Sequence, residues 1–349
     1  MKRVLLVAIS SLMVACSGNH EAENQLNNQE NQSTATQQPD KTEKVHAPAA
    51  SPVSPLSGEP LNEVSTQRAI SVILNNHPKA RPQSGLAEAD MIYEVLAEGG
   101  ITRLLAIYQS QYPERVGPIR SARDYHIELA GAFNSFFVAH GYSPDAFTML
   151  EQGVIEHMNG IQYDGELFIR SSDRAAPHNS YSGSGYFEQG AQRRGVSLEG
   201  APAAMAFSSE SDLVPEKAAS EFSVTYDGNE MYTSSYTYDA DGTYIRKIDG
   251  EMTIDEESGE PVSIANVLIA EAEHRIVDDQ GRLEIDLSSG GSAHLFTRGG
   301  YFKMEWKEED GRMVPYYKGE PAPLTPGLSW IHIIPEEKGF DELVTINND

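Results

Sequence analysis

The residues that follow the N-terminus limit which part of this chain can fold. Between Ser17 and about Pro60 the sequence contains no Phe, Tyr or Trp, and it is rich in Asn, Gln, Glu, Ser and Thr. Such a segment cannot bury enough apolar area to offset the loss of chain entropy on folding. We therefore predict a disordered tether over residues 17–60 and a folded body over residues 61–349.

The first sixteen residues have the pattern of an export signal. Lys2 and Arg3 precede an apolar run from Val4 to Val14, which is too short to span a bilayer as a helix. The Met-Val-Ala-Cys sequence that ends at Cys16 resembles a bacterial lipobox. The resemblance implies that Cys16 carries diacylglycerol, becomes the mature N-terminus and anchors the protein to a membrane. An ordinary secreted protein cut near a chance cysteine is the alternative.

Charge and cysteine content exclude several functions. The 26 Lys and Arg residues are outnumbered by 52 Asp and Glu residues, which gives a net charge of −26. A surface this acidic repels nucleic-acid backbones, so we expect no nucleic-acid partner. One cysteine allows neither an intramolecular disulfide nor a motif of paired cysteines. The histidines lack the close spacing of a zinc site, and we predict neither a metal nor another cofactor.

Residues 61–205 alternate between strand-like and helix-like patterns. Ser121, with Asp124 three residues later, resembles the capped start of a helix that continues to about Ala132. Ser143 followed by Pro144 predicts a second helix start. The strand-like runs are 69–74, 90–96, 101–109 and 135–139. Alternation of this kind is typical of an α/β lobe, here with a mixed sheet.

Residues 206–349 show a different pattern. Short segments of alternating apolar and polar residues are separated by Asp-Gly turn signals. These segments are 222–226, 235–238, 243–248, 264–270, 283–287, 292–297, 301–306 and 328–334. We predict a β-rich C-terminal lobe over residues 206–349 and an α+β fold for the whole chain.

Two arginines flank the predicted helix start at Ser121. Free backbone N–H groups and the helix dipole favour an anion at such a point, and the guanidinium groups of Arg120 and Arg123 would add bidentate recognition of a carboxylate or phosphate. In the alternative interpretation, Arg123 pairs with Glu94 or Glu98 and only stabilises the lobe.

Further polar residues mark the ends of predicted strands. His140 lies where a strand ends and a helix begins, the edge at which α/β folds tend to place ligands. Arg103 lies in a predicted strand after a Gly-Gly turn. A polar stretch downstream contains Arg170, Arg174, His178, Asn179 and Tyr181. Loops of this composition often carry function, although surface polarity alone would also explain them.

Several segments together resemble one known family. They are Asn-His-Pro at 76–78, Arg-Pro-Gln-Ser-Gly-Leu at 81–86, Tyr-Glu at 93–94, Glu-Gly-Gly-Ile-Thr-Arg at 98–103, Val-Gly-Pro-Ile-Arg-Ser-Ala-Arg-Asp at 116–124 and Arg-Ala-Ala-Pro-His-Asn at 174–179. These segments resemble the YerB-like bacterial lipoproteins, whose core is a domain of unknown function with a separate C-terminal part. The resemblance implies a lipoprotein with a division near residue 200, and it brings no established catalytic mechanism.

We predict a lipid-anchored lipoprotein on the extracytoplasmic face of the cell membrane. It would bind a cell-envelope ligand, such as peptidoglycan, or a wall-synthesis protein, and support wall assembly or its regulation. The predicted cleft residues are Arg103, Arg120, Ser121, Arg123, His140, Arg174, His178 and Asn179.

Two other functions remain open on the sequence alone. The first is a glycan-cleaving enzyme in which Glu98 or Glu94, with a raised pKa, acts as general acid. The second is a structural adaptor whose β-rich half docks a membrane enzyme.

Overall fold

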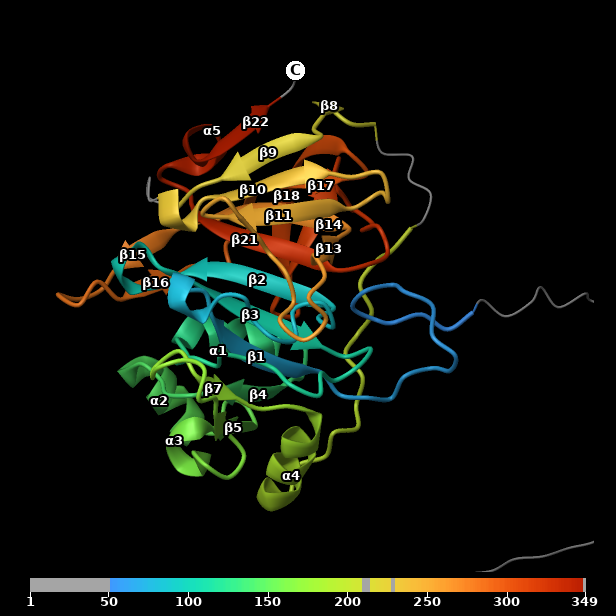
Figure 1. The fold of residues 1–349 in the computed structure, drawn as a ribbon. Helices are drawn as coiled ribbons and strands as arrows, with labels where there is room; N and C mark the ends of the chain where they lie inside the picture. Colours follow the sequence, from blue (N-terminus) through green and yellow to red (C-terminus); the bar gives the residue numbers. More distant parts are fainter. Residues whose placement is uncertain (1–50, 209–213, 227–229, 348–349) are drawn as a thin grey trace, which may run out of the picture. The chain divides into compact units, whose positions relative to one another are not determined.

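A computed structural model describes residues 51–208, 214–226 and 230–347 (Figure 1). The predicted signal with Cys16, and the predicted tether as far as residue 50, lie outside these residues. Ala50–Asp349 forms one compact unit. None of the described helices is long and apolar enough to cross a membrane.

A mixed sheet of twelve strands dominates the described part of the chain. Its strands, in order across the sheet, are β20 (Glu320–Pro321), β19 (Arg312–Tyr317), β18 (Gly300–Glu309), β17 (Gly291–Thr297), β14 (Asn266–Ala272), β21 (Ser329–Pro335), β2 (Met91–Leu96), β3 (Thr102–Tyr108), β1 (Ile70–Asn75), β4 (Phe136–Ala139) and β5 (His157–Asn159), while β8 (Lys217–Ala218) pairs with β18. The predicted α+β fold with a mixed sheet is confirmed.

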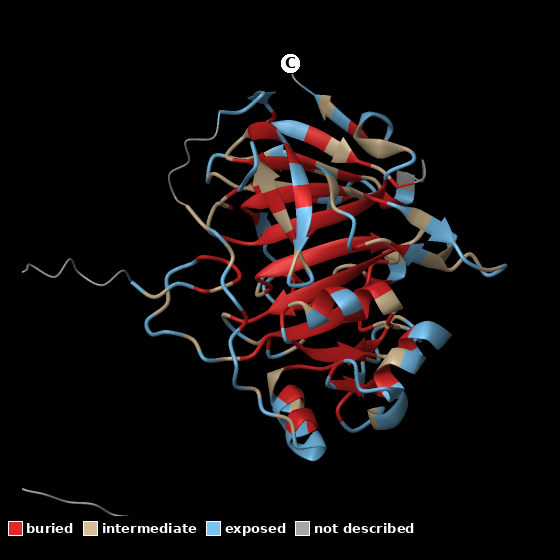
Figure 2. Cartoon of the chain, turned by 180° about the vertical axis from the view of Figure 1, so that it is seen from behind, coloured by how far each residue is buried: buried red, intermediate tan, exposed pale blue. Residues whose placement is uncertain are grey.

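The centre of this sheet joins the two halves of the sequence. β21 pairs in parallel with β14 on one side and with β2 on the other. Both β2 and β21 are buried along their whole length, as expected for apolar runs in parallel strands covered on both faces (Figure 2). Strands from the predicted lobes 61–205 and 206–349 thus share one sheet. The division into two domains stays a prediction.

A second sheet packs on one face of the large one. It contains β12 (Glu251–Met252), β11 (Tyr244–Ile248), β10 (Ser234–Tyr238), β9 (Glu221–Val224) and β22 (Val344–Asn347), while β13 (Ser263–Ile264) pairs with β11. The rings of Phe222 and Phe296 stack across the two sheets, with centroids 3.7 Å apart. Two hairpins, β6 (Ile169–Arg170) with β7 (Ser180–Tyr181) and β15 (His274–Ile276) with β16 (Leu283–Ile285), complete the described strands.

Two of the five α-helices in the described chain cover the opposite face of the large sheet, near the N-terminal strands. The α-helices of the described chain are α1 (Asp124–Gly131), α2 (Pro144–Glu151), α3 (Gly160–Tyr163), α4 (Ser184–Arg194) and α5 (Gly339–Leu343). From α1 and α2, Ile127 and Leu150 pack in the same core as Tyr93 of β2 and Phe137 of β4. Short 3₁₀ turns occupy Pro78–Ala80, Glu98–Gly100 and Glu230–Tyr232.

Two local features differ from the sequence predictions. Within the predicted tether, Leu56 is fully buried in the core and the Ser54 hydroxyl donates to Asp90 at 3.2 Å, so the stretch from Ser54 to Gly58 is packed against the body. Helix α1 begins at Asp124 rather than at Ser121, because Ser121 instead donates its hydroxyl to the His140 carbonyl at 3.1 Å. The helix start at Ser143 is as predicted: its hydroxyl accepts from the third N–H of α2.

Candidate anion-binding site

Three parallel strands end at one edge of the large sheet, and polar residues follow them. β1 pairs in parallel with β4, and β4 with β5. His77 lies two residues after β1, His140 follows β4 directly, and Asn159 is the last residue of β5. Ligand sites of α/β sheets gather at the carboxyl ends of parallel strands. This edge is therefore our candidate site.

The segment that carries Arg120 lies across the same edge. The Arg120 N–H donates to the Ile73 carbonyl at 2.8 Å, and the Arg120 carbonyl accepts from the His140 N–H at 3.0 Å. In the adjacent antiparallel pair, Arg103 of β3 lies opposite Asn75 of β1. Backbone pairing thus brings β1, β3, β4 and the Arg120 segment together.

Arg120 presents a guanidinium group that is available to a ligand. Its side chain is half-buried, and no described residue forms a hydrogen bond or an ion pair with its guanidinium. Burial, followed by the charge of Arg123, lowers its pKa. Burial also lowers the pKa of His77, His140 and His178, and the charge of Arg120 contributes to each shift. The backbone hydrogen bond between His140 and Arg120 places these two residues side by side.

His77 and His178 stack with ring centroids 4.6 Å apart, and we call them the imidazole pair. Asn75 Oδ1 accepts from the His77 N–H at 3.0 Å, so Asn75 Nδ2 faces His178 and donates to its Nδ1 at 2.9 Å. The Lys79 N–H donates to His77 Nδ1 at 3.1 Å. Because both Nδ1 atoms accept, the neutral rings carry their protons on Nε2. Each ring thus keeps an Nε2–H for which the described residues supply no acceptor.

Glu98 is held between two arginines. Arg123 donates to it twice, from Nε to Oε1 at 2.5 Å and from Nη2 to Oε2 at 2.6 Å, and Arg103 Nη2 lies 3.6 Å from Oε2. Arg103 also donates to the Ser121 carbonyl. Burial alone would raise the pKa of Glu98, but the hydrogen bonds and charge of Arg123 lower it. Two guanidinium groups on one carboxylate leave excess positive charge beside Arg120.

The raised pKa expected for Glu94 and Glu98 is wrong. Glu94 is fully buried, and its Oε2 accepts from Arg246 Nη2 at 2.8 Å and from Trp330 Nε1 at 3.0 Å. Burial would raise the pKa of Glu94, but the charges of Arg246 and His332 bring it below its ordinary value. Both carboxylates are therefore ionised at neutral pH and have no proton to give as a general acid.

His140 is fixed in an orientation that rules out a role as base toward Ser180. Arg170 Nη2 lies 3.1 Å from His140 Nε2, and an arginine only donates. His140 Nδ1 therefore carries the proton and donates to Ser180 Oγ at 2.8 Å. The ring packs so closely on Gly160 that a Cβ there would lie 2.2 Å from Nδ1. Asn179 joins this group through Oδ1, which accepts from Arg170 Nη1 at 3.1 Å.

Arg174 is occupied by a structural contact. Its Nη1 donates to the Ala80 carbonyl at 3.1 Å and to the Tyr181 hydroxyl at 2.7 Å, and its Nη2 donates to the Pro82 carbonyl at 2.7 Å and to Glu256 Oε1 at 3.0 Å. These bonds hold the 174–181 loop against the connection between β12 and β13. These contacts take both N–H groups of Nη1 and both of Nη2, and only the Nε–H of Arg174 remains for a ligand.

Most of the predicted residues lie at this edge, and two others were missed. Hydrogen bonds link Arg103, Arg120, Ser121, Arg123, His140 and Asn179, directly or through Glu98 and Arg170, and His178 is joined to the end of β1 through Asn75. The missed residues are His77 and Asn75. Their position at the end of β1, parallel to the strand that precedes His140, is the signal that would have found them.

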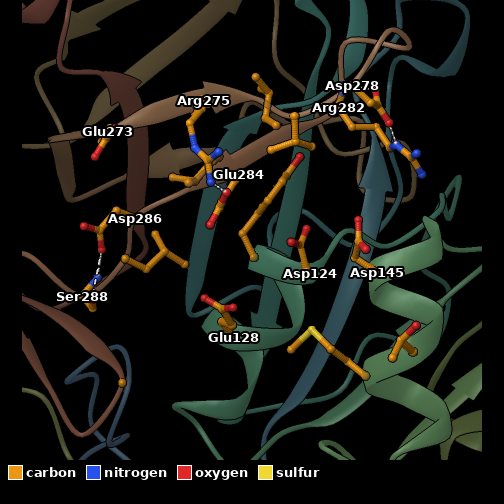
Figure 3. A pocket seen from close by; sticks show the side chains of 18 of the residues that line it. Asp124, Glu128, Asp145, Glu273, Arg275, Asp278, Arg282, Glu284, Asp286 and Ser288 are labelled. Carbon is orange, nitrogen blue, oxygen red and sulfur yellow. Dashed lines mark hydrogen bonds and ion pairs between the residues drawn. The ribbon is translucent and has the colours of Figure 1, made fainter.

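An acidic pocket of about 1140 Å³ lies between α1, α2 and the hairpin β15–β16 (Figure 3). Arg275 pairs there with Glu284 and Arg282 with Asp278. The other acidic residues that line it are Asp124, Glu128, Asp145, Glu273, Asp286 and Glu308. This lining does not suit an anion, and none of the predicted basic residues contributes to it. No three His, Cys, Asp or Glu side chains in the described chain are arranged to hold a metal ion.

Comparisons with known proteins give a consistent result. Residues 56–197 match the profile described as "Protein of unknown function (DUF3048) N-terminal domain", and residues 222–331 match that of the corresponding C-terminal domain. A Bacillus subtilis (strain 168) protein named "Putative lipoprotein YerB" is 43% identical over 300 residues, which cover 85% of this chain and 88% of that protein. A crystal structure of the YerB protein from Bacillus subtilis is 42% identical, with a TM-score of 0.79 over 85% of this chain and 99% of that one.

Proposed function

This chain belongs to the DUF3048 family of proteins of unknown function, and from the site at its sheet edge we propose that it is a lipid-anchored protein that binds an oxyanion of the cell envelope. The lipoprotein name of its relative and the lipobox at Cys16 support membrane anchoring. Exposure on the extracytoplasmic face is part of the proposal, because a lipobox follows an export signal.

The observation that carries the proposal is a set of donors without acceptors. The guanidinium of Arg120 and the two Nε2–H groups of the imidazole pair have no partner among the described residues. An oxyanion accepts such hydrogen bonds, and a charged partner makes them shorter and stronger than neutral ones. Arg103 and Arg123, which share one carboxylate, add positive potential at the same edge.

The charge of the whole chain narrows the class of ligand. A net charge of −26 repels extended polyanions at long range, whereas a small local basic site still attracts a single anionic group. A carboxylate on an otherwise neutral glycan or peptide satisfies both conditions. We therefore propose a carboxylate-bearing peptidoglycan fragment as the ligand, and a role in wall assembly or its regulation.

The test is a binding titration with the full-length protein in detergent. We expect Arg120→Gln to weaken binding of a disaccharide-peptide wall fragment by about 10- to 100-fold, since charge-assisted hydrogen bonds contribute about 1.5–3 kcal/mol. Arg194→Gln is the matched control, because Arg194 is exposed on α4 away from the site. Titration with glycerol phosphate separates a phosphate ligand from a carboxylate. Equal affinity of the Arg120 variant and the wild type would refute the proposal.

A further inference from the structure

A second, smaller pocket lies beside the candidate site. Its volume is about 390 Å³, within the range of small-molecule sites. It lies between the hairpin β6–β7, the segment before Val116 and the first turn of α4. The residues that line it are Glu114, Arg115, Ile169, Arg170, Ser171, Ser172, Tyr181, Ser182 and Tyr186.

The pocket is lined by hydrogen-bond donors, hydrogen-bond acceptors and apolar surface. The exposed Glu114 carboxylate and the Tyr186 hydroxyl have no hydrogen-bond partner among the described residues. Arg115 extends over the Tyr181 ring, with its guanidinium carbon 3.8 Å from the ring centroid. The exposed side chain of Ile169 adds an apolar surface. The pocket thus offers a free acceptor, a free hydroxyl, arginine donors and an apolar contact within one small volume.

That combination matches the chemistry of a sugar ring. Every sugar hydroxyl donates one hydrogen bond and accepts others, and the C–H groups of the ring form an apolar face. A carboxylate such as Glu114 accepts from hydroxyls, arginines donate to them, and Ile169 and Tyr186 suit the apolar face. A simple anion would be repelled by Glu114, and a purely apolar ligand would leave the carboxylate unsolvated.

Arg170 connects the pocket to the candidate site. It lines the pocket, while its Nη2 lies 3.1 Å from His140 Nε2 and its Nη1 donates to Asn179. Arg170 is itself fixed by Asp164, whose Oδ1 accepts from Nε at 3.0 Å. One side chain therefore contributes to both binding regions.

We propose that this pocket is a saccharide subsite, which receives a neutral sugar ring of the same ligand whose carboxylate binds at Arg120. The inference rests on the proposed function for the identity of the ligand, but the subsite binds a neutral sugar by itself. The pocket depends on close backbone approach at Gly183, where a Cβ would lie 1.9 Å from the Glu114 carbonyl oxygen.

The experiment uses two separate probes on the full-length protein in detergent. N,N′-diacetylchitobiose is a neutral disaccharide and reports on the pocket, whereas N-acetyl-D-alanyl-D-alanine presents a carboxylate without a sugar and reports on Arg120. Dissociation constants come from NMR titration. We expect Glu114→Gln to weaken chitobiose binding about tenfold and Tyr186→Phe to weaken it severalfold. Arg120→Gln and the control Glu188→Gln, on the exposed part of α4, leave it unchanged.

The outcomes separate the two proposals. Absence of chitobiose binding to the wild type at millimolar concentration, or binding unaffected by both pocket variants, overturns the saccharide subsite. Chitobiose binding that depends on Glu114, together with dipeptide binding indifferent to Arg120→Gln, supports the subsite and refutes the carboxylate site. If the saccharide subsite and the carboxylate site at Arg120 are both correct, the disaccharide-peptide binds more tightly than either probe, because one ligand then occupies both sites.

Discussion

Replacing Glu94 by Gln tests the buried ion pair between the two sheets. Glu94 of β2 and Arg246 of β11 are 0% and 1% exposed at their side chains, with Oε2 and Nη2 2.8 Å apart. Asn76 and Thr102 also donate to Glu94 Oε1, at 3.1 and 2.9 Å. The substitution keeps the shape of the side chain but removes its charge. It leaves the arginine, which also lies over the Trp330 ring, without a counter-ion.

The expected cost follows from the burial of both partners. Removal of one member of a buried pair costs about 3–5 kcal/mol, mainly because the remaining charge stays desolvated. This is a large share of the 5–15 kcal/mol by which domains are typically stable. The exposed pair of Glu166 and Arg193 has side chains 59% and 44% exposed, so Glu166→Gln is the matched control, with an expected cost of about 0–1 kcal/mol.

Equilibrium unfolding in guanidinium chloride measures both variants. The double variant Glu94→Gln with Arg246→Met should recover much of the loss, because no unpaired charge remains. The pKa of Glu94 is lowered in the folded protein, so its contribution is complete above its unfolded pKa and is lost as the pH falls through the lower folded value. The difference between wild type and Glu94→Gln should thus shrink in acid. A cost below about 1 kcal/mol at neutral pH would refute this reasoning.

Two further predictions concern the candidate site and the anchor. Gly160→Ala should displace His140 and lower the free energy of unfolding by about 1–3 kcal/mol. Gly131→Ala is the control, because no atom lies within 4 Å of its new Cβ, and it should leave the stability unchanged. Equal stability of the two variants would argue against close packing of His140 on Gly160. Cys16→Ser should move the protein from the membrane to the soluble fraction on cell fractionation, and continued membrane association would show that lipidation is not the anchor.

Features set by neighbouring residues were the ones that could be predicted from the sequence. The helix start at Ser143 depends on a hydroxyl and a proline in adjacent positions, and both act as expected. Ser121 has an equally favourable local pattern for a helix start. In the structure, however, its hydroxyl donates to the His140 carbonyl, and the Ser121 carbonyl accepts from Arg103. Contacts with residues far away in the sequence thus prevented the predicted helix start at Ser121, and such contacts cannot be predicted from the local sequence.

The candidate site was predictable in its charge but not in its detail. Arg120 and Arg123 were found because they flank a helix start. His77 and His178 depend on Asn75, which neither residue's local sequence indicates. The Asn75 side chain accepts from the His77 backbone N–H and donates to His178 Nδ1, which leaves Nε2 of His178 for a ligand. Glu94 was misjudged because its partner, Arg246, lies 152 residues away in the chain. An ion pair between residues so far apart in the sequence can be predicted only when the order of the strands is known, and strand propensity does not give that order.

The position of β21 has a consequence for how the chain is made. This strand is synthesised after both β2 and β14, yet it lies between them and pairs in parallel with each. A product that stops before Ser329 lacks β21, so β2 and β14 each keep an unpaired edge. Unpaired strand edges promote aggregation. The large sheet is therefore continuous only in a chain that has been extended through β21.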